Sequence, residues 1–220
     1  MARRLKHHGT LDDASLAKIY DTLARTIDPK SDLEYGSPFE LLVAVVLSAQ
    51  ATDKSVNLAT RRLYPLANTP QSVLALGVEG LTPYIKHIGL YRGKAKNVIE
   101  LCRLLIERHG GEVPGDRAAL EALPGVGRKT ASVVLNVAFG QPTIAVDTHV
   151  QRVANRLGIT KTTTPEQSEQ VLLARTPTKH LQQAHHYLIL HGRYCCTARS
   201  PMCGECPIRQ WCPFPDKTPI

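Results

Sequence analysis

The sequence lacks any long hydrophobic run, and its first residues contain no apolar segment. No apolar stretch approaches the ~20 residues that a membrane-spanning helix needs. The opening MARRLKHHGT also lacks the apolar core of a secretory signal peptide. We therefore expect no membrane span and a cytoplasmic location, where thiols stay reduced rather than forming disulfides.

Acidic residues are scarce relative to basic ones. The 220 residues include 27 Lys and Arg against 19 Asp and Glu, which gives a formal net charge of +8. A charge of this sign favours a polyanionic partner such as nucleic acid. Proteins that never bind nucleic acid also carry such a charge, so it only supports the motifs described below.

The hydrophobic pattern shows no strand-like alternation, and helix-start signals recur along the chain. The segment SPFE at 37–40 is a capping box that starts an apolar helix through Leu47. The segment TPEQ at 164–167 has the same start signal, and a shorter helix starts at Thr69-Pro70. A longer amphipathic helix is expected over 92–109. The sequence therefore predicts an all-α fold.

The most informative segment is LPGVGRKT at residues 123–130. A short helix over 117–121 and a second helix over 128–139 are expected to flank a tight turn. Gly125 and Gly127 permit positive φ angles in this turn. Such a turn directs backbone N–H groups toward one point near a helix N-terminus, where a phosphate can bind without sequence preference. An ordinary connector between two helices is the alternative.

A lysine and a carboxylate follow this turn. Lys129 lies in the first turn of its helix, where the helix dipole should lower the pKa of the ammonium group. A neutral lysine can attack carbon, so Lys129 is a candidate Schiff-base nucleophile, with phosphate binding as the alternative role. Downstream, VDTH at 146–149 supplies Asp147, which can assist the lysine or only cap the helix that follows.

Four of the six cysteines are concentrated near the end of the chain. Their positions are Cys196, Cys203, Cys206 and Cys212. Reduced thiolates at the spacing x6-x2-x5 can surround one metal centre, and zinc or an iron–sulfur cluster both fit four cysteines. Disulfides are the alternative. Cys102 and Cys195 are expected not to be ligands.

Together these motifs resemble the endonuclease III family of bifunctional DNA glycosylases, within the helix–hairpin–helix superfamily. The similarity includes SPFELLVAVVLSAQATDKSVN and IGLYRGKAKN, and it extends from about Ser37 to Cys212. The resemblance implies that Lys129 is the nucleophile and Asp147 its carboxylate partner. It also implies that the four-cysteine loop binds a [4Fe–4S] cluster.

The resemblance further implies two helical domains. A six-helix domain would span residues 32–141 and carry the helix–hairpin–helix at about 116–140. Residues 142–220 would form an iron–sulfur cluster domain, against which the N-terminal helix of residues 1–31 would pack. The active site would lie in the cleft between the two domains.

The resemblance also points to residues that contact DNA. Gln50 and Leu90 would enter the base stack and fill the space left by an everted nucleotide. Without the resemblance, Leu90 reads as a core residue, Gln50 as a polar helix terminus and His149 as a surface histidine. The remaining expected contacts are His149 and the hairpin residues Leu123, Gly125, Val126 and Gly127.

The predicted function is base-excision repair. We expect a lysine Schiff base to remove oxidised pyrimidines and β-elimination to cleave the strand. The partner would be double-stranded DNA with damaged pyrimidines or abasic sites, bound by a monomer and, in a bacterium, at the nucleoid. The alternatives are a monofunctional adenine or mismatch glycosylase and a non-catalytic helix–hairpin–helix DNA-binding protein. Lys129 argues against the first, whose members lack a lysine at this position.

Overall fold

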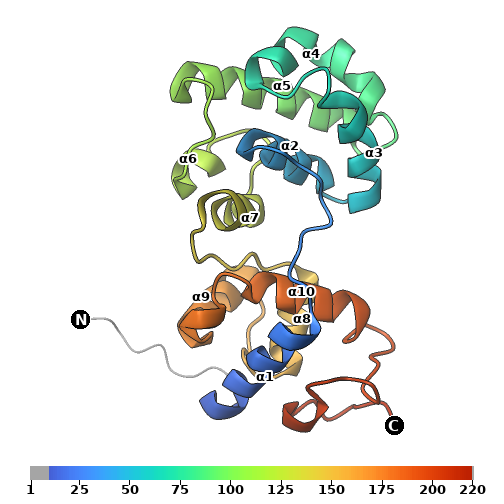
Figure 1. Cartoon of the computed structure of the whole chain (residues 1–220), viewed down its shortest axis with the longest axis vertical. Helices are drawn as coiled ribbons and strands as arrows, with labels where there is room; N and C mark the ends of the chain where they lie inside the picture. Colours follow the sequence, from blue (N-terminus) through green and yellow to red (C-terminus); the bar gives the residue numbers. More distant parts are fainter. Residues whose placement is uncertain (1–9, 220) are drawn as a thin grey trace, which may run out of the picture. The chain divides into compact units, whose positions relative to one another are not determined.

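A computed structural model describes residues 10–219, and every regular element within this range is helical (Figure 1). The all-α prediction is therefore confirmed. None of the described helices is both long and apolar enough to cross a membrane. The chain divides into two compact units, one formed by Ser31–Gln141 and the other by the segments before and after it.

The Ser31–Gln141 unit is built around a buried central helix. Its helices are α2 (Pro38–Ser48), α3 (Asp53–Leu63), α4 (Pro70–Ile85), α5 (Tyr91–His109), α6 (Arg117–Glu121) and α7 (Arg128–Phe139). Helix α2 packs against α3, α5 and α7 (Figure 1), and every residue from Phe39 to Leu47 is buried. A helix that is apolar on all sides is stable only when its neighbours cover it.

Two helix-start predictions in this unit can be compared with the structure. Ser37 Oγ accepts a hydrogen bond from the Glu40 amide at 3.1 Å, as a capping box requires. The Glu40 carboxylate accepts from Gly36 N–H at 2.5 Å, one residue earlier than expected. The helix after Thr69 is longer than predicted, because α4 continues to Ile85 across a break at Gly77 (φ 64°).

The second unit joins the first helix of the chain to its last third. Its elements are α1 (Asp13–Thr26), α8 (Thr148–Arg156), α9 (Pro165–Arg175), η1 (Thr178–His180), α10 (Ala184–Tyr194) and η2 (Arg209–Trp211). Helix α10 packs against α1 and α8. The Tyr20 hydroxyl lies 3.0 Å from Thr176 Oγ1, and His180 Nε2 lies 2.7 Å from Asp21 Oδ1. These side-chain contacts bind α1 to the segment that follows α9.

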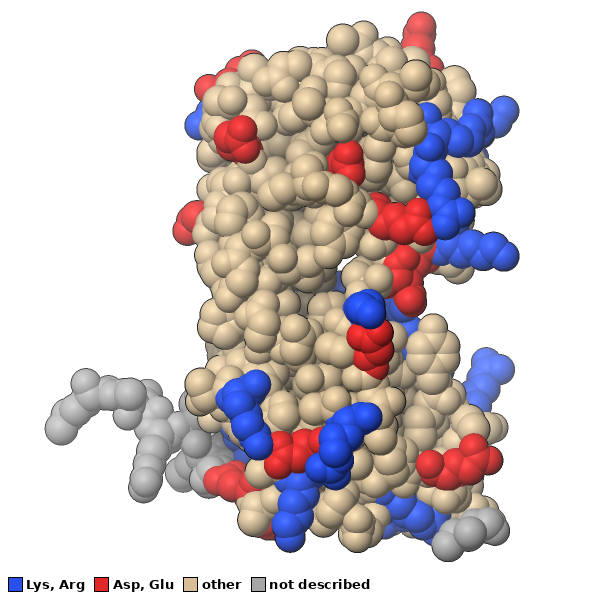
Figure 2. Space-filling model, in the orientation of Figure 1, with Lys and Arg blue, Asp and Glu red and all other residues tan. Residues whose placement is uncertain are grey.

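The surplus positive charge is distributed over the surface. Figure 2 shows Lys and Arg side chains on both units, with Asp and Glu side chains among them. Several basic groups of the described residues are paired with acids, as in the contact of Arg103 with Glu100 and Glu107. The Lys and Arg side chains of the described residues therefore do not form one continuous basic stripe on the face shown.

Candidate functional site

The glycine hairpin between α6 and α7 has the predicted helix–turn–helix form. Asp116 caps α6 by accepting a hydrogen bond from the Ala119 amide at 2.8 Å. The turn closes where the Val126 amide donates to the Leu123 carbonyl at 3.1 Å. The side chains of Leu123 and Val126 are 3% and 5% exposed. Any contact of these two residues with DNA must therefore come from their backbone.

The two glycines of the hairpin have different roles. Gly125 adopts φ 80°, as predicted, and a Cβ there would lie 3.1 Å from Val46 Cγ1 and 3.3 Å from the side chain of Asn97. Gly127 has φ −96° and ψ 178°, so the prediction of positive φ at this position is wrong. It is the N-cap residue of α7, it is exposed, and a Cβ there would meet nothing within 4 Å. The fold requires a glycine at 125 but not at 127.

Lys129 is the second residue of α7, and its side chain is exposed. The N-cap of this helix is Gly127, which supplies no capping side chain. The N-terminus of a helix carries partial positive charge and presents backbone N–H groups to an anion. The structure thus places an exposed lysine in the first turn of a helix whose N-terminus is suited to bind a phosphate.

Asp147 is the N-cap of α8, as the sequence predicts. Its Oδ1 atom accepts hydrogen bonds from the amides of His149 and Val150, both at 2.9 Å. Its Oδ2 atom lies 3.4 Å from His149 Nδ1, and the Asp147 side chain is 14% exposed. The positive end of α8 stabilises negative charge on this carboxylate.

The segment before Asp147 is held by a residue of α10. His185 is buried, and its Nδ1 atom lies 2.7 Å from the Ala145 carbonyl oxygen. Sequence reasoning did not connect His185 to the segment before Asp147. The sequence carries no signal for this contact, because His185 reaches the Ala145 carbonyl only once the chain has folded.

Gln50 and Leu90 have unusual backbones. They are the described non-glycine residues with positive φ, at 54° and 60°. Leu90 is 68% exposed, so its interpretation as a core residue is wrong. The two turns are neighbours, because a Cβ on Gly89 would lie 3.6 Å from the Gln50 carbonyl oxygen.

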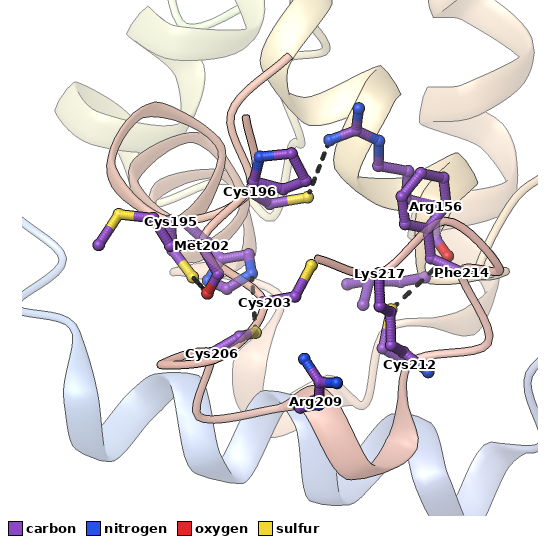
Figure 3. Close-up of a pocket in the computed structure, with 13 residues that line it drawn as sticks. Arg156, Cys195, Cys196, Met202, Cys203, Cys206, Arg209, Cys212, Phe214 and Lys217 are labelled. Atoms are coloured by element: carbon purple, nitrogen blue, oxygen red, sulfur yellow. Dashed lines mark hydrogen bonds between the residues drawn. The ribbon is translucent and has the colours of Figure 1, made fainter. Parts of the chain in front are cut away.

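The cysteine loop surrounds one pocket of the second unit (Figure 3). The four predicted ligands all line this pocket, and so does Cys195. Basic side chains line it too, and Arg156 Nη1 donates to Cys196 Sγ at 3.5 Å. Four thiolates around an iron–sulfur cluster carry net negative charge, which these cations stabilise. The donor set and its charged surroundings therefore fit an iron–sulfur cluster.

A histidine adds to this pocket. The ligand atoms of His191, Cys195 and Cys206 lie within 4.8 Å of one another. Hydrogen bonding between these two thiols lowers the pKa of Cys206 and raises the pKa of Cys195. Sequence reasoning missed the position of His191 beside these sulfurs. Cys102 is buried in α5 and does not line the pocket.

Comparisons with known proteins match these features. The family described as "HhH-GPD superfamily base excision DNA repair protein" matches residues 43–178, and "Iron-sulfur binding domain of endonuclease III" matches residues 196–212. Endonuclease III of Escherichia coli (strain K12) is 60% identical over 87% of this chain and 91% of its own length. Endonuclease III of Haemophilus influenzae is 58% identical over 86% and 90%.

Solved structures show the same similarity. A trapped endonuclease III–DNA covalent intermediate is 45% identical, with a TM-score of 0.87 over 93% of this chain and 97% of that chain. A thermostable thymine-DNA glycosylase, 23% identical, has a TM-score of 0.83 over 92% of this chain and 97% of that chain. At that lower identity the likeness concerns the fold alone.

Proposed function

The chain belongs to the endonuclease III family of the HhH-GPD superfamily, and on this premise we propose that it removes oxidised pyrimidines through a Schiff base on Lys129 and then cleaves the strand by β-elimination. Membership in this family makes it a DNA-binding base-excision repair glycosylase with a [4Fe–4S] cluster as cofactor. The position of Lys129 carries the proposal, because an exposed amine follows a hairpin suited to phosphate binding.

The reaction begins when the neutral amine of Lys129 attacks C1′ of the deoxyribose. The bond from C1′ to the base breaks, and its electron pair leaves with the base, which takes up a proton. The sugar ring then opens and leaves a Schiff base between C1′ and the lysine nitrogen. Loss of a proton from C2′ expels the 3′ phosphate, and water finally hydrolyses the Schiff base to release Lys129.

Asp147 supplies the carboxylate for this chemistry. Oδ1 of Asp147 accepts hydrogen bonds from two amides of α8, which fixes the position of the carboxylate. In the proposed reaction the carboxylate accepts a proton from Lys129 or stabilises the positive charge that develops at C1′. The capping and catalytic roles coexist, because the cap fixes the direction of the carboxylate.

Gln50 and Leu90 occupy the space of the everted nucleotide. Extrusion of a base from a duplex costs a few kcal/mol, and side chains that fill the gap offset part of this cost. Leu90 is 68% exposed, so its apolar side chain is in contact with water. Its φ of 60° is also unfavourable for a residue other than glycine. Insertion of its side chain between bases would give both features a function.

The cluster is assigned to the loop that ends the chain. The residues that would hold it are Cys196, Cys203, Cys206 and Cys212. When bound, it links four points of a loop that otherwise has little regular structure. The loop is already fixed by Thr218, whose Oγ1 accepts from the Cys203 amide at 3.0 Å and donates to the Pro201 carbonyl at 2.7 Å.

We also propose that a single copy of the chain acts on DNA at the bacterial nucleoid. Its relatives are bacterial, and its substrate lies there. The lysine, the carboxylate and the four cysteines belong to one chain, so a second copy has no residue to add. Light scattering of the purified protein bound to DNA should give the mass of one protein and one duplex.

Borohydride trapping tests the proposal. The protein is mixed with a duplex that contains thymine glycol, and sodium borohydride is added during the reaction. The wild type should form a covalent adduct, because reduction fixes the Schiff base. The Lys129→Gln variant should form none, while the control Lys161→Gln, which alters another exposed lysine, should react like the wild type.

The same assay distinguishes the alternatives. A monofunctional glycosylase would release the base without forming an adduct. A non-catalytic DNA-binding protein would neither release the base nor form an adduct. Either result with the wild-type protein contradicts the proposed lyase.

A further inference from the structure

Lys94 is a buried lysine to which neither the sequence motifs nor the proposed chemistry gives a role. It lies in the first turn of α5, and its side chain is only 6% exposed. Lysine is almost never fully buried without a partner, because an ammonium group loses its hydration inside a protein. Among the described residues, Lys94 makes no ion pair with a carboxylate. Burial lowers the pKa of Lys94.

The partner of this ammonium group is the end of a neighbouring helix. Lys94 Nζ donates to the Leu47 carbonyl oxygen at 2.9 Å. Leu47 lies in the last turn of α2, where carbonyl groups have no partner within the helix and the dipole favours a cation. The chain leaves α2 at Ser48 and reaches Gln50 two residues later. The bond from Lys94 therefore holds the point from which the Gln50 turn departs.

The backbone of the same residue holds the second turn. The Lys94 amide donates to the Leu90 carbonyl at 3.1 Å, and this bond starts α5 directly after Leu90. The two turns also touch each other, because the Gln50 carbonyl lies against Gly89. The segment before Leu90 is also joined to α3, because His87 Nε2 lies 3.0 Å from the Ser55 carbonyl oxygen. Lys94 is thus bonded to both chain segments that carry the positive-φ residues.

We propose that Lys94 is a positioning residue that holds Gln50 and Leu90 together in the arrangement in which both enter the DNA stack. A left-handed backbone at a non-glycine residue persists only where its surroundings enforce it. The buried hydrogen bond from the Lys94 ammonium group to the last turn of α2 helps to hold both turns in this conformation. The inference rests on the proposed function, because it assumes that these two residues fill the gap in the duplex.

The test compares two lysines of the same helix. Lys94→Met removes the ammonium group and retains most of the buried stem, whereas Lys96→Met alters an exposed lysine two residues away and serves as the control. The DNA is a duplex with a tetrahydrofuran abasic analogue opposite 2-aminopurine, whose fluorescence rises when the base is unstacked. Lys94→Met should bind this duplex about tenfold to hundredfold more weakly and lose the fluorescence increase. Lys96→Met should match the wild type.

A double-mutant cycle separates positioning from general stability. Lys94→Met is also introduced into a protein that already carries Gln50→Ala and Leu90→Ala. If Lys94 acts through these two side chains, the added loss of binding should be within about twofold. An equal loss in both backgrounds, or wild-type behaviour of Lys94→Met, overturns the proposal.

Folding and the underlying function are controlled separately. Circular dichroism shows whether Lys94→Met is folded at the assay temperature. If it is not, Lys94→Gln, whose side chain is one bond shorter and does not reach Leu47, undergoes the same cycle with the same expected loss. If the wild type itself gives no fluorescence increase although borohydride traps it, the roles of Gln50 and Leu90 fail, and this inference fails with them.

Discussion

The two glycines of the hairpin allow stability and DNA binding to be separated. Gly125→Ala forces a side chain into a residue with φ 80°, within 3.1 Å of Val46. Gly127→Ala places the same methyl group on an extended backbone in open space. The first change should therefore act on folding and the second on the approach of a phosphate.

The magnitudes follow from these geometries. A left-handed backbone costs an alanine roughly 1–2 kcal/mol, and the close contacts of Gly125→Ala add about 1–3 kcal/mol, for a total of about 2–5 kcal/mol. For a chain of this length, each kcal/mol lowers the Tm by about 2–4 °C. At Gly127, alanine is a weaker N-cap than glycine, which lowers stability. Alanine also reduces the conformational entropy of the unfolded chain, which raises stability, so the free energy of unfolding should change by less than about 0.5 kcal/mol.

Thermal melting and DNA binding are measured on both variants. Gly127→Ala should melt like the wild type and bind an abasic-analogue duplex about tenfold to hundredfold more weakly, because a charge-assisted hydrogen bond to phosphate is lost. Gly125→Ala should melt several degrees lower. Unchanged DNA binding of Gly127→Ala would refute the assignment of the hairpin as a phosphate site.

Two further predictions concern the carboxylate and the cluster. Asp147→Asn keeps a good N-cap and should melt like the wild type, whereas Asp147→Ala should lower the free energy of unfolding by about 1 kcal/mol. Both variants should slow single-turnover base release by at least ~100-fold. Equal losses of base release and DNA binding in Asp147→Asn would assign the residue to structure. The purified protein should be yellow-brown with about four iron and four sulfide per chain. Cys195→Ser should retain this colour and Cys206→Ser should lose it, whereas a colourless zinc protein would contradict the cluster.

Features set by local chemistry could be predicted from the sequence. A side chain that caps a helix acts within three residues, so the starts at Ser37, Asp116 and Asp147 were correct. Glycine was a less certain guide, because it permits positive φ without requiring it. Gly125 uses this freedom and Gly127 does not.

Features that depend on tertiary packing were missed. Lys94 is buried because α5 packs on α2, yet a signal was present in the sequence. Lys94 lies on the apolar stripe that continues to Val98 and Leu101, at positions i, i+4 and i+7 of α5. A cation within such a stripe indicates a buried partner. Its identity, the Leu47 carbonyl, could come only from the structure.

The cysteine loop shows the same limit. The spacing predicted that four sulfurs would face one pocket, and they do. The fifth sulfur could not be placed from spacing, because adjacent residues normally point in different directions. Cys195 follows α10 with φ −122° and ψ −62°, a non-helical geometry, and its sulfur lies within 4.8 Å of the sulfur of Cys206.

The covalent bond between protein and DNA tests the central claim most directly. The borohydride-reduced adduct is digested with protease and nuclease, and the modified peptide is sequenced by mass spectrometry. The account predicts a reduced deoxyribose remnant on the Nζ atom of Lys129. A remnant on any other amine of the chain, or an adduct that persists in Lys129→Gln, would contradict it.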